Sequence, residues 1–565
     1  MASITKRIIS GHTYYYAVRC QRVNGKPRLT WQKYLGTAED IIESRTRPKV
    51  VKPKRTKLFD YGGVMAMYDI AKRLQVVETI DQFVPENKSN PTVGEYMLLA
   101  AINRCVCPKS KRKIGQWYEG TSLVRFIPAR RVDLSSQRFW DNMDKIKEDM
   151  IPKIEEALTK KVINEFGIDL RCLVYDPTNF HTFIDTFTDS PLAQRGHNKQ
   201  KRNDLRQVGL ALLVSTDFHI PLLHQVYQGN LQDSVQFSAI TDELVSRYKI
   251  FSQQCGKITL VYDKGNNSEE NFARINQSPY HFVGSLVPTH HTDLLAIPRR
   301  KYKMTEIEGV EAYRTKKNVF GKERTIIITY NDTLFIAQMR TTLLQLSKKR
   351  QKLSALIRQL KKKTKRRKKH SVNSVRKKVK AILSGQHMSE LIKTNVRGRK
   401  GHVKLSYETD VTALSRLSRT LFGKTILFTD NDTWSDEEII RAYRSQFHIE
   451  DAFKQMKNPH FVSWKPMFHW TDQKIRVHAF YCVIALTLAS LLRRELAHKK
   501  IHMSIPAIFE NLNEIHETAL IYLKGTSKDD IVLSEMDETQ QLLFDTLNLG
   551  KYCVLYNTDS VAVSG

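Results

Sequence analysis

Two short apolar segments share the letters LVYD, and each ends in an aspartate. Residues 171–175 (RCLVY) precede Asp176, and residues 258–262 (ITLVY) precede Asp263. Each segment is typical of a buried strand, and sites of open α/β sheets lie at the carboxyl ends of such strands. If the strands are neighbours, both carboxylates can share divalent cations, which would offset their mutual repulsion. One such aspartate alone would more simply form a turn, so the matched pair carries the prediction.

A third candidate acid lies on a helix predicted for residues 436–457. At about 100° per residue, an apolar stripe is formed by Ala442, Ile449, Phe453 and Met456. Polar residues line the flank of this stripe at Tyr443, Gln446, Glu450 and Lys457. This pattern predicts that Glu450 faces the sheet edge and that Asp451 lies on the opposite, solvent-facing side. An ordinary amphipathic helix with a polar flank is the alternative.

The elements predicted after Asp176 alternate between strands and helices. They are an antiparallel strand pair, a helix, a strand, a helix and a strand, at residues 208–215 with 222–227, 238–248, 258–262, 268–275 and 281–286. This order predicts an α/β sheet with helices on its faces.

The region before Asp176 has a different pattern. Residues 12–36 alternate around Asn24-Gly25, which predicts a β-hairpin. Its basic and aromatic side chains suit contact with a DNA backbone, and a purely structural hairpin is the alternative. Residues 44–57 are basic and contain proline, so a linker is expected. Helical periodicity over residues 62–165, with Ser135 or Ser136 as one N-cap, predicts a helical domain.

The overall charge indicates a polyanionic partner. The 565 residues include 91 Lys and Arg against 58 Asp and Glu, a formal net charge of +33. This exceeds what solubility requires of a surface, and nucleic acid is the first candidate. Hydrophobic residues make up 41% of the chain, so a folded protein of about two to four domains is expected.

The most basic segment, residues 347–380, contains no Asp or Glu. Helical spacing in its first half is shown by Leu346, Leu353, Leu356, Ile357 and Leu360. The cations predicted to contact duplex phosphates are Lys361, Lys362, Lys363, Arg366, Arg367, Lys368 and Lys369. A solvated charged face or a nuclear-import-like run is the alternative.

Cysteines and apolar segments bear on the compartment. The seven cysteines are irregularly spaced, so we expect reduced thiols in a cytosolic protein. The sequence MASITKRIIS lacks the apolar run of a signal peptide. Residues 479–492 are too short to span a bilayer and predict a buried core helix. No membrane partner is therefore expected.

At the three acids the chain resembles insertion-sequence transposases of the DDE type that carry a YREK signature. In that group the last catalytic helix has Tyr, two residues, Arg, three residues, Glu, six residues and Lys. Tyr443, Glu450 and Lys457 match at this spacing, and Gln446 stands where Arg is usual. The hairpin, the YDPTNF and YDKGNN strand ends, the FVGSL strand and the insertion before the last helix also resemble one elongated branch. The resemblance covers most of the chain.

The resemblance implies a ribonuclease-H-like catalytic core whose insertion lies between the second Asp and the Glu. It implies that Asp176, Asp263 and Glu450 are the catalytic residues and the ligands of two Mg²⁺ (or Mn²⁺) ions. Tyr443 and Lys457 would hold the transposon-end backbone, and Gln446 would face the same DNA with an uncharged amide. The implied partners are double-stranded DNA, as terminal inverted repeats and target, and further copies in a homodimer or higher assembly. The implied location is the prokaryotic cytoplasm, at the nucleoid through DNA binding.

Combined with the predicted elements, the resemblance suggests an α/β fold with a β-rich and basic helical insertion. The expected domains are an N-terminal β-hairpin and basic linker (1–60), a helical DNA-binding domain (61–166), the first part of the catalytic core (167–286), the insertion with its basic helix (287–424), the last part of the core with the signature helix (425–500) and a C-terminal helical region (501–565).

The expected function is DNA cleavage followed by joining of the freed 3′ hydroxyl to target DNA. Water attacks first and the 3′ hydroxyl attacks next by the same in-line geometry, so no covalent protein–DNA intermediate is needed. A ribonuclease-H-like nuclease without strand transfer and a non-catalytic DNA-binding derivative are the alternatives. Arginine at Gln446 would add a charged fork suited to phosphate, so Gln446→Arg is expected to tighten end binding.

Overall fold

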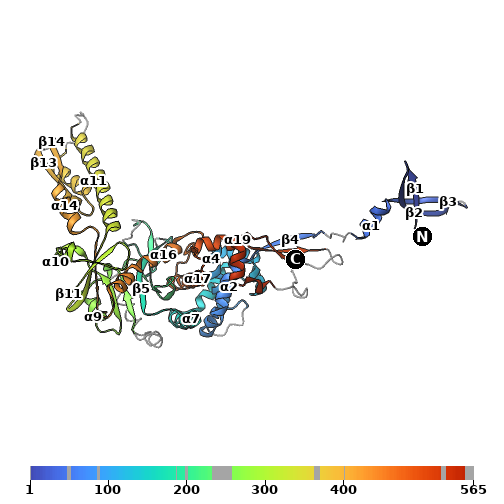
Figure 1. Cartoon of the computed structure of the whole chain (residues 1–565), viewed down its shortest axis with the longest axis horizontal. Coiled ribbons are helices and arrows are strands. Elements are labelled where there is room, and N and C mark those ends of the chain that lie inside the picture. The colour runs from blue at the N-terminus through green and yellow to red at the C-terminus, as the bar shows by residue number, and fades with distance from the viewer. Residues whose placement is uncertain are drawn as a thin grey trace. The chain divides into compact units, whose positions relative to one another are not determined.

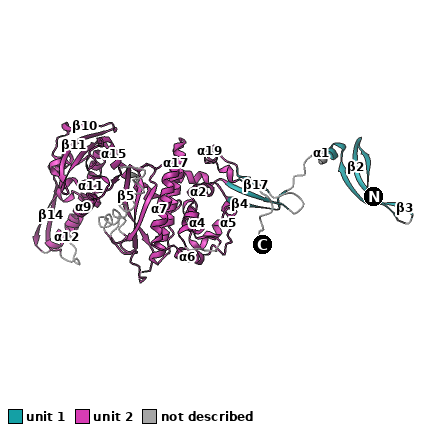
Figure 2. Cartoon of the chain, turned by 90° about the horizontal axis from the view of Figure 1, so that it is seen from below, with its two compact units in different colours: residues 1–59, 516–534, 553–565 teal, residues 60–515, 535–552 magenta. Residues whose placement is uncertain are grey.

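The chain forms two compact units in the computed structural model (Figure 2). The structure describes residues 2–23, 25–46, 52–84, 90–185, 187–196, 202–231, 257–361, 370–399, 401–522 and 530–553. The first unit comprises Met1–Phe59, His516–Ser534 and Cys553–Gly565, and the second comprises Asp60–Ile515 and Glu535–Tyr552. All three candidate acids lie in the second unit.

The first unit contains two three-stranded sheets. Antiparallel strands β1 (Ser3–Ile9), β2 (His12–Val23) and β3 (Lys26–Gly36) form one sheet, and helix α1 (Ala38–Thr46) follows it. The predicted hairpin is thus present with β1 as an added strand. Its turn includes Gly25 at φ +77°, a backbone conformation that favours glycine.

The second sheet of this unit joins distant parts of the sequence. Its order is β17-β16-β4, formed by β4 (Arg55–Asp60), β16 (His516–Ile521) and β17 (Asp530–Leu533). The region 501–565 was expected to be helical. It contains these two strands as well as α18 (Ile505–Leu512) and α19 (Glu538–Thr546), because the short segments HETALI and DIVL pair with each other.

A nine-stranded mixed sheet is the framework of the second unit. Its order is β10-β11-β12-β15-β9-β8-β5-β6-β7. Strands β5, β8 and β9 are mutually parallel, and the other paired strands are antiparallel. The bounds are β5 (Cys172–Thr182), β6 (Arg206–Ser215), β7 (Pro221–Gln228), β8 (Thr259–Val261), β9 (His281–Ser285), β10 (Lys303–Met304), β11 (Val310–Val319), β12 (Lys322–Asn331) and β15 (Lys424–Thr429). The prediction of an α/β fold is confirmed.

Of the two helices predicted between the strands that follow Asp176, one lies within the described residues. Helix α9 (Glu269–Ile275) lies between β8 and β9 in sequence, as expected. The predicted helix over residues 238–248 falls outside the described residues. The shorter helices are η1 (Ser122–Arg125), η2 (Lys264–Asn266), η3 (Pro288–His290), α10 (Thr292–Leu295), η4 (Arg299–Lys301) and η5 (Leu549–Tyr552).

A helical bundle flanks β7 at one end of the sheet. Its helices are α2 (Gly62–Arg73), α3 (Val76–Phe83), α4 (Val93–Val106), α5 (Lys111–Glu119), α6 (Ser136–Lys145), α7 (Met150–Phe166) and α17 (Asp472–His498). Ser135 caps α6 by accepting a hydrogen bond from the Arg138 amide, as predicted. Helix α17 packs against α2, α4 and β7, which ties the bundle to the sheet. This helix is long and apolar enough to cross a membrane, and 89% of its most apolar window is buried inside the protein.

The chain between β12 and β15 folds into a subdomain with its own core (Figure 1). It consists of α11 (Asp332–Lys361), α12 (Val372–Ile382), α13 (Met388–Leu391), β13 (Ile392–Arg399), β14 (His402–Thr409) and α14 (Val411–Thr420). Leu346, Leu353 and Leu356 of α11 are buried in this core, so the predicted helical spacing is confirmed. The basic segment therefore begins on a packed helix.

Candidate active site

Asp176 lies on β5, and Asp263 follows two residues after the end of β8, the neighbouring parallel strand. Strands β5 and β8 pair in the register Cys172↔Thr259 to Val174↔Val261. The same offset, continued two residues further, places Asp176 level with Asp263. Neighbouring strands are about 5 Å apart, so the two carboxylates begin from adjacent backbone positions. Asp176 is half-buried and Asp263 is exposed.

Strand β5 does not end at Asp176, contrary to the prediction. It continues to Thr182 because β6 pairs with it along its whole length, with Asp176 opposite Leu212. Strand β8 does end early, at Val261, and Asp263 begins the short helix η2. The sheet edge at this site is therefore a step, where β8 stops and β5 continues beside it.

The helix that carries the third acid is divided into two segments. Helix α15 (Asp436–Arg444) begins with a capping box formed by Ser435 and Glu438, and α16 (Gln446–Lys457) follows after Ser445. The Ser445 hydroxyl donates a hydrogen bond of 2.5 Å to the Ala442 carbonyl. Sequence periodicity predicted one continuous helix. The break at Ser445 does not shift the 3.6-residue spacing of the apolar residues, so the periodicity gives no sign of it.

The predicted apolar stripe is buried. Ala442, Ile449, Phe453 and Met456 are all buried, as the spacing predicted. Helix α15 packs against β9 and β15, and α16 packs against β5. The two segments therefore cross the sheet from the end of β9 toward β5.

Two hydrogen bonds fix this crossing at its ends. The Tyr443 hydroxyl donates to Oγ of Ser285, at the end of β9, over 2.8 Å. The Lys457 ammonium donates to Oγ1 of Thr178, on β5, also over 2.8 Å. Strand β8 lies between β9 and β5 in the sheet. Glu450 is seven residues from Tyr443 and seven from Lys457. It therefore lies midway between these two hydrogen bonds, on the part of the helix that passes β8, the strand before Asp263.

The electrostatics of Tyr443 connect this helix to the second aspartate. Burial is the main cause that raises the pKa of the Tyr443 hydroxyl, and the negative charge of Asp263 raises it further. The hydroxyl of Tyr443 donates its hydrogen bond to Ser285 in the neutral form.

The exposure of the two adjacent acids differs from the expectation. Glu450 is exposed, whereas Asp451 is half-buried. The prediction that Asp451 is the solvent-facing member of the pair is wrong, since Glu450 is the more exposed of the two. An exposed Glu450 is accessible to an ion or to DNA from solution.

The donor chemistry of the three acids suits a hard divalent cation, which prefers carboxylate oxygens. The register of Asp176 and Asp263 fits a shared ion. Across the residues that the structure describes, however, there is no group of three or more His, Cys, Asp or Glu close enough to hold a metal. The structure brings two acids level and carries the third on a helix that crosses the same edge.

Gln446 does not present its amide nitrogen to solvent. The residue is half-buried, and its Nε2 is buried without a hydrogen-bond partner. The sequence pattern suggested a donor to DNA phosphate at this position. Gln446, the first residue of α16, instead directs its amide nitrogen toward the interior of the protein.

The basic candidates lie mostly outside the described residues. Lys361 is the exposed last residue of α11. Six of the candidates lie outside the described residues: Lys362, Lys363, Arg366, Arg367, Lys368 and Lys369. Beyond them, α12 contributes further exposed cations at Arg376, Lys377 and Lys378, so positive charge continues on both helices around the gap.

Sequence reasoning missed Thr178 and Ser285, the two hydroxyl anchors. Thr178 lies two residues after Asp176, and alternate residues of a strand project to the same face. That spacing could have identified it as a neighbour of the acid. Ser285 had no comparable signal, because the sequence does not show which strand ends beneath Tyr443.

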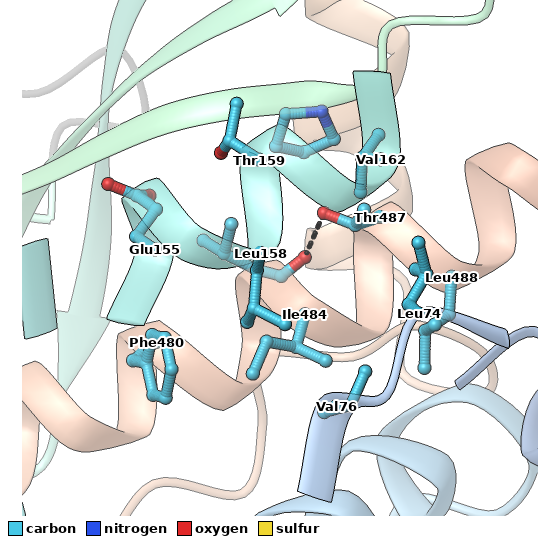
Figure 3. Close-up of a pocket in the computed structure, with 12 residues that line it drawn as sticks. Leu74, Val76, Glu155, Leu158, Thr159, Val162, Phe480, Ile484, Thr487 and Leu488 are labelled. Atoms are coloured by element: carbon cyan, nitrogen blue, oxygen red, sulfur yellow. Dashed lines mark hydrogen bonds between the residues drawn. The ribbon is translucent and has the colours of Figure 1, made fainter. Parts of the chain in front are cut away.

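A small cavity lies away from these residues, between α7, α17 and β7 (Figure 3). Its volume is about 40 Å³, and mostly apolar side chains such as Leu158, Phe480 and Ile484 line it. Small-molecule sites generally enclose about 300 Å³ or more. This cavity is therefore a packing defect of the bundle and gives no indication of a ligand.

Comparisons with known proteins give the family of the chain. A family model described as transposase DDE domain matches residues 169–488, which is 320 of the 565 residues. One similar solved structure is the cryo-EM structure of the piggyBac transposase synaptic complex with hairpin DNA. The likeness covers 82% of each chain at 9% identity with a TM-score of 0.33. No curated protein matches. The family match includes all three acids and the insertion between them.

Proposed function

The chain belongs to the transposase DDE-domain family, and from this premise we propose that Asp176, Asp263 and Glu450 are its catalytic acids. As a DDE transposase it cleaves DNA and carries out strand transfer. The finer proposal is that it acts on the ends of an insertion sequence of the YREK type. The observation that most supports the assignment of the acids is the β5–β8 register, whose continuation past the end of β8 would bring Asp263 beside Asp176.

DDE transposases use divalent metal ions, and we propose two Mg²⁺ or Mn²⁺ ions here. Asp176 and Asp263 would hold them with Glu450, because carboxylate oxygens are their preferred ligands. When bound, such a pair supplies stabilisation of both the attacking and the leaving oxygen at phosphorus. Glu450 would supply the third carboxylate from α16.

The residues around the acids would hold the DNA. Lys457, the last residue of α16, donates a hydrogen bond to Thr178, which lies two residues after Asp176 on β5. Its positive charge is thereby held near the first acid. Tyr443 occupies the other end of the crossing at Ser285. In this proposal the terminal backbone of the transposon lies across α15 and α16, between these two side chains. The cations at Lys361 and beyond would contact phosphates of end or target duplexes from the insertion.

The proposal includes an assembly of two or more copies on paired ends, in the cytoplasm of a prokaryotic host. Joining both ends of one element to one target requires two active sites to act together. The net charge of +33 opposes association of free copies and favours association on a polyanion.

A two-stage assay tests the proposal. Duplexes that carry the repeats flanking the reading frame are incubated with Mg²⁺, and 3′ hydroxyl ends are measured. A pre-cut end and a supercoiled plasmid then report joining. Cleavage and joining by the wild-type chain, both lost in Asp176→Asn, are expected.

Other outcomes decide between the alternatives. Cleavage without joining, under conditions where pre-cut ends are bound, would identify a nuclease. Tight binding without cleavage in either metal would identify a non-catalytic derivative.

A further inference from the structure

The sheet β1-β2-β3 is unusually positive. Residues 1–36 contain seven Lys and Arg and no Asp or Glu. The acids nearest in sequence, Glu39, Asp40 and Glu43, all belong to α1. The sheet therefore presents cations without compensation from its own strands.

The strand register divides these cations between two faces, because directly paired residues project to the same side. One side, the tyrosine face, carries residues paired as Arg7↔Tyr14, Tyr16↔Tyr34 and Val18↔Gln32. The opposite side, the open face, carries residues paired as Ile4↔Ala17, Lys6↔Tyr15, Ala17↔Lys33, Arg19↔Trp31 and Gln21↔Arg28.

The tyrosine face is internally packed. Tyr34 lies 5.3 Å from Tyr16 and 6.0 Å from Tyr14, measured between ring centroids. The Arg7 guanidinium stacks over the Tyr16 ring and donates a hydrogen bond to Gln32. Val18 is buried. The polar and aromatic groups of this face are therefore engaged with one another.

The open face has the opposite character. Lys6, Arg19, Arg28 and Lys33 are exposed, and none of them forms an ion pair with a carboxylate in the described part of the chain. Large apolar side chains are exposed among these cations: Trp31 at 47%, Ile4 at 65% and Ile8 at 69%. The four cations repel one another, so an anionic partner would stabilise this surface. The exposed apolar side chains among them favour a partner that also makes apolar contacts.

We propose that the open face is a binding site for double-stranded DNA, seated in the major groove. Three strands span about 10 Å, which fits a groove about 12 Å wide. Lys6, Arg19, Arg28 and Lys33 contact phosphates at its borders. Trp31 and the isoleucines contact base edges and thymine methyl groups. The net charge of +33 favours this polyanionic partner over a protein surface. The inference rests on the proposed function for the identity of the DNA, and adds a site on a unit separate from the catalytic sheet.

The test compares matched double variants on the two faces of one sheet in the full-length chain. Arg19→Gln with Lys33→Gln removes two charges from the open face, and Arg7→Gln with Arg22→Gln removes two from the tyrosine face. Arg22 belongs to that face because it alternates in step with Tyr16 and Val18 along β2. Binding of a 40-base-pair fluorescent duplex from the flanking repeats is measured from about 50 to 300 mM salt. A random duplex of equal length is the second probe.

The open-face variant is expected to bind both duplexes about tenfold more weakly at about 0.1 M salt, with a salt slope lower by about two units. The tyrosine-face variant should retain the wild-type slope. Trp31→Ala should weaken binding about fivefold or more without changing the slope, because it removes an uncharged contact. Circular dichroism establishes that each variant is folded.

The outcomes separate this inference from the proposed function. If the open-face variant binds both duplexes as the tyrosine-face variant does, the inference is overturned. If the wild-type chain binds neither duplex, the proposed function fails as well. The open-face variant should still cleave bound ends at saturating protein, whereas Asp176→Asn should bind with the wild-type slope and not cleave.

Discussion

The ammonium of Lys457 donates a hydrogen bond to Thr178, two residues beyond Asp176 on the same face of β5. The same ammonium lies 5.3 Å from the ring centroid of Phe180, the next residue on that face. The last residue of α16 is thereby held beside the strand that carries the first acid. A charge in this position is fixed relative to Asp176, and it does not depend on the exposed turn of α16 around Glu450.

This relationship predicts different effects for its two partners. Lys457→Met should weaken binding of end duplexes and lower the salt slope by about one unit, because a phosphate contact is lost. Thr178→Val should keep the slope and slow single-turnover cleavage about fivefold, because only the position of Lys457 is relaxed by about 1 kcal/mol. An unchanged slope in Lys457→Met would show that its charge does not contact DNA.

Glu450 and Asp451 provide a matched comparison of adjacent acids. Glu450→Gln should reduce Mg²⁺-dependent cleavage by about a thousandfold, since loss of a metal ligand removes several kcal/mol of transition-state stabilisation. End binding should persist. Asp451→Asn makes the matching carboxylate-to-amide change at the neighbouring acid. Its cleavage rate should stay within about threefold of wild type. The reverse order of effects would transfer the third ligand to Asp451.

The basic segment should act through charge. Replacing Lys361, Lys362, Lys363 and Arg366 by Gln is expected to weaken binding of all duplexes and to lower the salt slope by up to about four units. The control is Lys153→Gln with Lys160→Gln on α7, whose ammonium groups already pair with Asp149 and Glu156. Equal salt slopes for both variants and the wild type would identify the segment as a solvated surface.

Gln446 now carries a prediction about stability. Its Nε2 is buried without a partner, so Gln446→Met should leave the fold equally stable or more stable, by up to about 1 kcal/mol. Gln446→Arg should lower Tm, because a guanidinium in the same place would lose water without gaining a partner. Thermal unfolding of both variants checks this. A stable Gln446→Arg protein with tighter end binding would show that this side chain turns outward toward DNA.

The sequence by itself determined the chemistry and most of the elements. The apolar stripe through Ile449 and Met456 and the leucines of α11 gave predictions that the structure confirms. The two LVY segments are strands as predicted, although β5 continues past Asp176 and β8 ends at Val261. These features are local, because periodicity follows directly from which side chains one face of a helix or strand must bury. The family match extends over the same residues.

Only the tertiary structure decided which elements meet. Pairing with β6 carries β5 past Asp176 to Thr182, and the order β9-β8-β5 sets Ser285 and Thr178 on either side of the strand before Asp263. The sequence contains no local signal for these relationships, because strand neighbours are selected by packing between segments far apart in the chain. The same reason explains why Asp451 is less exposed than Glu450, and why the open face of the β1-β2-β3 sheet became visible only once its register was known.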